Sequence, residues 1–118
     1  MKKQKADPSV VNLLELIPDK NIKSEKSEDG FSVLLKPKYR HPLFVKHVLP
    51  HMKRPNYKIN LDDIGTFIWD LCDGKNTVEE IGNKLKETFG DKVEPLYDRL
   101  RIFFQNLEKN KFITFKNL

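Results

Sequence analysis

Apolar side chains recur every three or four residues through the second half of the chain. This spacing predicts three helices, over about 61–72, 78–89 and 93–109. The stripes that define them are Leu61, Ile64, Phe67, Ile68, Leu71 and Cys72 in the first, Val78, Ile81, Leu85 and Phe89 in the second, and Val93, Leu96, Tyr97, Leu100, Phe103, Phe104 and Leu107 in the third.

Residues at the ends of these stripes indicate where the helices start and stop. We expect Asn60 to cap the first helix, and Thr77 to cap the second with Glu80 completing a capping box. Gly90 should end the second helix. Gly82 lies inside that helix at a cost of about 1 kcal/mol relative to Ala, so either another element approaches closely there or the glycine is neutral drift.

Before the helices the pattern changes to alternation, which predicts strands. Residues 21–28 and 31–35 should form a hairpin around the turn signal Glu28-Asp29-Gly30. A third strand, 57–61, should run directly into the first helix. After the last helix, residues 111–116 alternate over a length that suits a short strand or the stub of a hairpin.

The predicted order is an N-terminal three-stranded sheet, three helices and a short C-terminal strand or hairpin. This is an α+β fold, and the short turn between the second and third helices favours a winged helix-turn-helix arrangement. A length of 118 residues with 38% hydrophobic content suits one domain. We expect that domain over residues 20–118, preceded by an N-terminal extension, 1–19, with a short helical segment at 10–17.

The formal net charge of +5 is concentrated in one region. Residues 1–58 hold 13 basic and 6 acidic side chains, whereas residues 59–118 hold 9 and 11. Within the first half, residues 36–58 contain seven Lys or Arg, no acid, all three histidines and four of the seven prolines. We call residues 36–58 the basic insert. A short amphipathic helix between Pro42 and Pro50 is expected inside it.

The sequence offers few candidates for catalysis. Trp69 and Cys72 lie on or beside the apolar face of the first helix, so we expect both in the core, and a single cysteine excludes an internal disulfide. His41, His47 and His51 permit a metal site, but no carboxylate is near and zinc needs three or four ligands. We therefore expect that the chain is not an enzyme and that it binds neither a metal nor a cofactor.

The run Ile59-Asn60-Leu61-Asp62-Asp63-Ile64-Gly65-Thr66-Phe67-Ile68-Trp69-Asp70-Leu71-Cys72-Asp73-Gly74, with Thr77-Val78-Glu79-Glu80-Ile81 and a closing Phe112-Ile113, resembles the PqqD family of coenzyme PQQ synthesis protein D. The resemblance covers about half of the chain, from Ile59 to Phe115. It implies a module that binds the leader of a ribosomally made precursor peptide and presents its core to a modifying enzyme, often a radical-SAM protein.

In that family the leader is added as a strand beside the third strand, in a groove walled by the third helix. An unpaired strand edge supplies main-chain hydrogen bonds for such binding. The corresponding edge here is Asn56, Tyr57, Lys58, Ile59 and Asn60, and the helix positions off the core stripe or at its margin are Arg99, Ile102 and Phe103. Arg99 or Arg101 would pair with a leader carboxylate. The plainer alternatives are an ordinary core strand and an exposed isoleucine without a function.

Two other functions compete with peptide binding. A winged-helix nucleic-acid-binding protein is one, but residues 93–109 carry three acids and three bases, whereas a DNA-reading helix should be basic. The other is docking of the basic insert on a protein or an anionic membrane surface. The plainer alternative for the insert is a solvated loop that covers the sheet. We expect no membrane span, a cytoplasmic location and, because a strand edge permits it, a possible homodimer.

Overall fold

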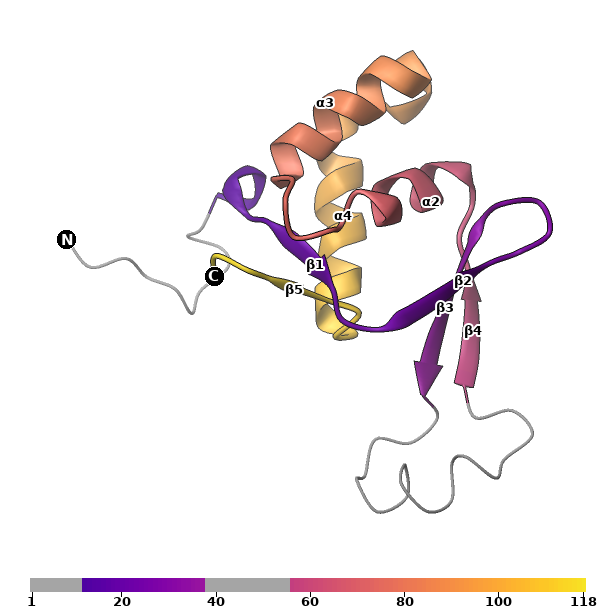
Figure 1. Ribbon diagram of the computed structural model, residues 1–118. Coiled ribbons are helices and arrows are strands. Elements are labelled where there is room, and N and C mark those ends of the chain that lie inside the picture. The colour runs from indigo at the N-terminus through magenta and orange to yellow at the C-terminus, as the bar shows by residue number, and fades with distance from the viewer. Residues whose placement is uncertain (1–11, 38–55) are drawn as a thin grey trace.

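The computed structural model of the protein describes residues 12–37 and 56–118. Figure 1 shows an α+β fold in which three α-helices gather on one side and a three-stranded sheet projects from them. In chain order the elements are η1 (Leu13–Glu15), β1 (Pro18–Lys20), β2 (Lys23–Lys26), β3 (Ser32–Pro37), β4 (Asn56–Asn60), α2 (Asp63–Asp70), α3 (Val78–Phe89), η3 (Gly90–Val93), α4 (Leu96–Lys109) and β5 (Ile113–Phe115).

The larger sheet is antiparallel in the order β2-β3-β4, so β3 is central and β4 lies at one edge. Its centre pairs Leu34 with Ser24 on β2 and with Ile59 on β4. Leu34 is fully buried in the main core. The alternation over residues 31–35 predicted this strand, and the face of β3 that carries Leu34 packs on the helices.

A second, two-stranded sheet joins the two ends of the described chain. β1 pairs with β5 in antiparallel register, from Pro18 opposite Phe115 to Lys20 opposite Ile113. The C-terminal segment therefore forms a strand, as one of the two predictions had it, but its partner comes from the other end of the chain. β1 also crosses the expected boundary between residues 19 and 20.

Two helix starts differ from the prediction. Asp62 rather than Asn60 caps α2, because its side chain accepts the Gly65 N–H at 2.7 Å. α4 begins at Leu96 rather than near Val93. A residue before proline is disfavoured in helical conformation, and Glu94, which precedes Pro95, is extended at ψ 146°. The capping box of Thr77 and Glu80 on α3 is confirmed, as is the helix end at Gly90.

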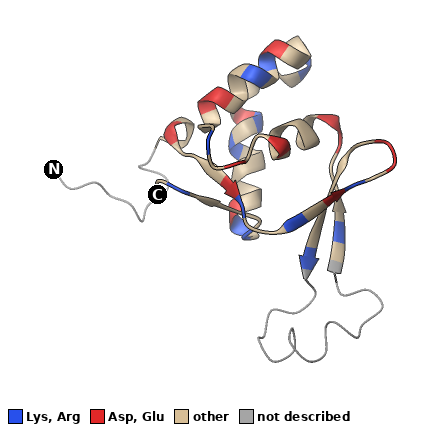
Figure 2. Cartoon of the chain, in the orientation of Figure 1, with Lys and Arg blue, Asp and Glu red and all other residues tan. Residues whose placement is uncertain are grey.

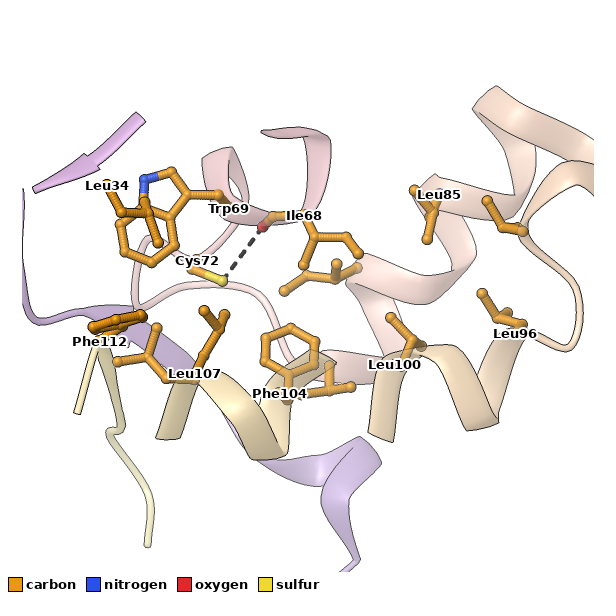
Figure 3. Close-up of a cluster of buried hydrophobic side chains, with 14 residues drawn as sticks. Leu34, Ile68, Trp69, Cys72, Leu85, Leu96, Leu100, Phe104, Leu107 and Phe112 are labelled. Carbon is orange, nitrogen blue, oxygen red and sulfur yellow. Dashed lines mark hydrogen bonds between the residues drawn. The ribbon is translucent and has the colours of Figure 1, made fainter. Parts of the chain in front are cut away.

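The core lies between the three helices and the inner face of β3 (Figure 3). Trp69 and Phe104 are its largest fully buried side chains, and Cys72 is buried between α2 and α4, as predicted. The indole N–H of Trp69 donates to Ser24 Oγ at 3.1 Å, which joins α2 to β2. None of the helices in residues 12–37 and 56–118 is long and apolar enough to cross a membrane.

Candidate functional site

The outer edge of β4 presents backbone groups that β3 does not use. Leu61 N–H donates to Ser32 O at 2.9 Å, at the end of the β3–β4 ladder. Because hydrogen bonding alternates along an antiparallel pair, Ile59 and Tyr57 also direct their N–H and C=O groups to β3. Lys58 and Asn60 direct theirs outward. Within the described residues β4 pairs with β3 alone, so this edge is open to a further strand.

The two edges of the sheet differ in charge. β2 forms the other edge, and three of its four residues, Lys23, Glu25 and Lys26, are charged and exposed. Charged side chains on an edge strand oppose pairing with another chain. β4 carries one charged residue, Lys58, whose Nζ lies 3.4 Å from Glu25 Oε2. Figure 2 shows this contrast, with both signs of charge along β2 and a single basic position on β4.

One face of α4 forms the wall of an open, mainly apolar cavity of about 400 Å3. Ile102 is exposed over 52% of its surface there, and Phe103 is half-buried beside it. An exposed isoleucine beside an aromatic ring offers apolar surface, and a ligand that removes this surface from water gains binding free energy. The residues that line this cavity are Pro95, Asp98, Arg99, Ile102, Phe103 and Asn106.

A second cavity, of about 340 Å3, lies where β4 passes into α2. It shares Arg99 and Phe103 with the first, so the two cavities form one continuous surface from the end of β4 along α4. We call this surface the groove. The residues that line the second cavity are Asn60, Leu61, Asp62, Ile64, Gly65, Ile68, Arg99 and Phe103.

Arg99 is held in the groove by the backbone of η3. Its Nε donates to Val93 O at 3.2 Å and one terminal nitrogen donates to Lys92 O at 3.5 Å. A guanidinium carries five N–H donors, so three remain for a ligand. Arg101 differs, because its Nη2 lies 3.8 Å from Asp98 Oδ1 and it lines neither of these two cavities.

The structure therefore brings together some of the residues expected at the site. Asn60, Arg99 and Phe103 line one cavity, and Ile102 lines the other together with Arg99 and Phe103. Ile59 packs against the core, and Tyr57 is exposed over 55% of its surface. The remaining expected residues, Lys58 and Asn56, lie on the edge strand β4, and of Asn56 only the backbone is described.

Eight further groove residues were not among the expected ones, and four of them show why the sequence pattern does not reveal them. Leu61 and Ile64 belong to the apolar stripe of the first helix, a pattern typical of core positions, although both stay half-buried. Asp62 caps α2 and lines the second cavity as well. Pro95 directly precedes α4 and lines the first cavity. The partial exposure of Leu61 and Ile64, at the N-terminal end of their stripe, depends on how the neighbouring helix packs. It therefore cannot be predicted from the spacing of apolar residues alone.

Cys72 has the surroundings of a structural residue. Burial raises the pKa of its thiol to about 12, despite the opposing effect of Lys20. Its Sγ donates to Ile68 O at 3.3 Å (Figure 3). Because the thiolate is the nucleophilic form, this thiol is unreactive at neutral pH.

The expected metal-ligand candidates give no site in the part of the chain that is described. His41, His47 and His51 lie outside the described residues, as does the short helix expected between Pro42 and Pro50. Among residues 12–37 and 56–118 there is no group of three or more His, Cys, Asp or Glu side chains that could hold a metal ion.

Comparison with known proteins identifies the family of this chain. Residues 46–113, more than half of the chain, match the model of the PqqD family, coenzyme PQQ synthesis protein D. The chain belongs to this family, as its sequence pattern predicted. The matched stretch includes β4, α2, α3 and α4, and thus the whole groove. No curated protein and no solved structure matches the chain.

Family membership gives the site a general context. Members are known as non-catalytic accessory binding proteins, and the family indicates a role in the biosynthesis of PQQ or of another modified peptide. A peptide and a biosynthetic enzyme are the partners that this context suggests.

Proposed function

We propose that this protein is a non-enzymatic module that captures the leader of a precursor peptide by strand addition and presents it to a modifying enzyme, in keeping with the radical-SAM partners of its family. The leader pairs with the outer edge of β4, and its side chains reach the groove along α4. The module works in the cytoplasm, and the winged-helix arrangement of β4 and the helices supplies the binding surface.

The observation that carries this proposal is the coincidence of an open strand edge with an apolar groove. The outward backbone groups of Lys58 and Asn60 offer two donors and two acceptors to an added strand. Asn60 also lines the groove, so a chain that pairs with β4 reaches Arg99 and Phe103 without a turn. Main-chain hydrogen bonds then give affinity, and the groove gives selectivity.

The choice of β4 over β2 follows from the side chains. A strand paired with β2 would lie beside exposed charged side chains along that strand. A strand paired with β4 would instead extend the cross-strand row formed by Leu34 and Ile59. Fully buried Leu34 and half-buried Ile59 provide an apolar start for that row. Cross-strand pairs of this kind each contribute roughly 0.2–1 kcal/mol.

The direct test is a nuclear magnetic resonance titration. The uniformly labelled full chain is titrated with the precursor peptides encoded near its gene. Amide resonances of residues 56–60 and of α4 should shift together and saturate. Shifts confined to the basic insert, or shifts seen with DNA and not with peptide, would overturn the proposal. A concentration series without peptide separates leader binding from self-pairing of β4 in a homodimer.

A proline at position 58 gives a sharper test of strand addition. The Lys58 N–H points away from β3, so Lys58→Pro leaves the β3–β4 ladder intact and removes one outward donor. Lys58→Ala is the matched control, because both variants lose the ion pair with Glu25. Peptide affinity should fall at least about tenfold for the proline variant relative to the alanine variant. Equal affinities would exclude main-chain pairing at this position.

A further inference from the structure

A strand added to β4 would continue the rows of side chains that cross the sheet. On the face toward the helices, one row runs from Leu34 to Ile59. The next such row runs from Ser32 to Leu61, which the 2.9 Å hydrogen bond between them defines. Side chains on one face of a strand recur every second residue, so the ligand residues that extend these two rows lie two positions apart.

The first of these rows selects an apolar side chain. Leu34 is fully buried and Ile59 packs partly buried against the same core. A polar third member would lose hydration against these side chains without gaining a partner. Ile102 and Phe103 of α4 add apolar surface to the groove that this strand would follow.

The second row leads to Arg99. Leu61 ends that row and lines the same cavity as Arg99. The Arg99 side chain is oriented by Val93 O and Lys92 O, and among the described residues no carboxylate lies within 4.0 Å of it. Asp62 lines this cavity too, but its Oδ1 accepts the Gly65 N–H. An arginine fixed in this way binds a carboxylate with charge-assisted hydrogen bonds.

Resting on the proposed function, we propose that the recognised segment carries an apolar residue and, two positions away, Asp or Glu. The apolar residue lies beside Ile59, and the carboxylate pairs with Arg99, which is the specificity-determining residue. Asp98 does not oppose this pairing strongly, because Arg101 lies 3.8 Å from it and offsets its charge.

The test is a selection of displayed random twelve-residue peptides on the immobilised full chain, run in parallel on wild type, Arg99→Glu and Arg101→Glu. The two variants change the net charge equally and lie on the same helix, but only Arg99 lines the groove. Wild type and Arg101→Glu should enrich an apolar residue followed or preceded, at a spacing of two, by Asp or Glu. Arg99→Glu should retain the apolar position and replace the acid by Lys or Arg.

The readouts separate this inference from the proposed function. Selected peptides that shift the amides of residues 56–60 but show no acidic preference, or keep it in Arg99→Glu, would overturn the role of Arg99 and leave strand addition standing. A change of preference in Arg101→Glu equal to that in Arg99→Glu would show general electrostatics and would also overturn it. Failure to enrich any peptide that shifts these amides would overturn both.

Discussion

Gly82 on α3 and Leu100 on α4 lie in direct contact across the interface of the two helices, where a Cβ added to Gly82 would come within 2.8 Å of Leu100 Cδ1. Leu100 is fully buried and has little room to move. The glycine that costs helix propensity therefore permits close packing of α3 on α4, the helix that carries the groove. Of the two explanations left open by the sequence, close approach is confirmed.

Replacing Gly82 by valine should therefore destabilise the fold. Overpacking of a core costs about 1–3 kcal/mol, and we expect a loss of that size in the free energy of unfolding. The measurement is urea denaturation followed by the fluorescence of buried Trp69. Asn83→Val is the matched control, because it introduces the same residue at an exposed position of α3 and should change stability by less than about 0.5 kcal/mol. Equal stabilities of the two variants would contradict the contact.

A buried hydrogen bond between β3 and α2 should be equally sensitive. The Ser32 N–H donates to Thr66 Oγ1 at 2.8 Å, and both residues are buried. Thr66→Val leaves this N–H without its acceptor, which should cost about 1–3 kcal/mol in the free energy of unfolding. Thr66→Ser keeps a hydroxyl and should recover most of the loss. If the serine variant is as unstable as the valine variant, lost methyl packing rather than the hydrogen bond is responsible.

The helices of this protein were predictable because their signals are local. Thr77 and Glu80 form a capping box within four residues, and the three apolar stripes repeat at helical spacing. The pairing of β1 with β5 was not predictable in the same way. Pro18–Lys20 is too short to show alternation, and its partner Ile113–Phe115 lies near the other end of the chain. Pairing at such separation depends on the packed helices that bring both ends together.

The groove was predictable only in part for a related reason. Arg99 and Ile102 were found because helical periodicity places them off the core stripe. The sequence pattern does not reveal Ile64 and Pro95, because their exposure depends on how α2 and α4 are placed relative to each other. Helical periodicity carries no information on the distance between two helices. The open edge of β4 likewise depends on the order of strands in the sheet.

The Cys72 thiol should resist alkylation while the protein is folded. Burial raises its pKa to about 12, so almost none of it is thiolate at mildly alkaline pH. Because the pKa in the folded state lies above the ordinary thiol pKa of 9.0, Cys72 contributes to the free energy of unfolding below pH 9.0. This contribution is lost as pH rises toward 12. Iodoacetamide labelling followed by mass spectrometry should be slow in buffer and fast in denaturing urea. Rapid labelling of the folded chain, at the rate seen in urea, would show that Cys72 is accessible.

Glu94 should make the turn before α4 sensitive to acid. Its Oε1 accepts the Leu96 N–H at 3.1 Å, and its other oxygen pairs with Lys86, which also bonds Asp91. The hydrogen bond from Lys86, followed by that from Leu96, lowers the pKa of Glu94 below its ordinary 4.5. A lowered carboxyl pKa stabilises the fold above the unfolded-state pKa, and this contribution is lost as pH falls through the folded-state value.

The expected result concerns the difference in free energy of unfolding between wild type and Glu94→Gln. At about pH 7 wild type should have the larger free energy of unfolding. The difference should shrink toward zero at about pH 3, as Glu94 becomes protonated. Added salt should reduce it at neutral pH, because the groups are exposed and screened. Glu87→Gln makes the same replacement at an exposed position of α3 and is the matched control. Urea denaturation across this pH range provides the measurement, and a difference that stays constant with pH would mean that Glu94 acts through shape rather than charge.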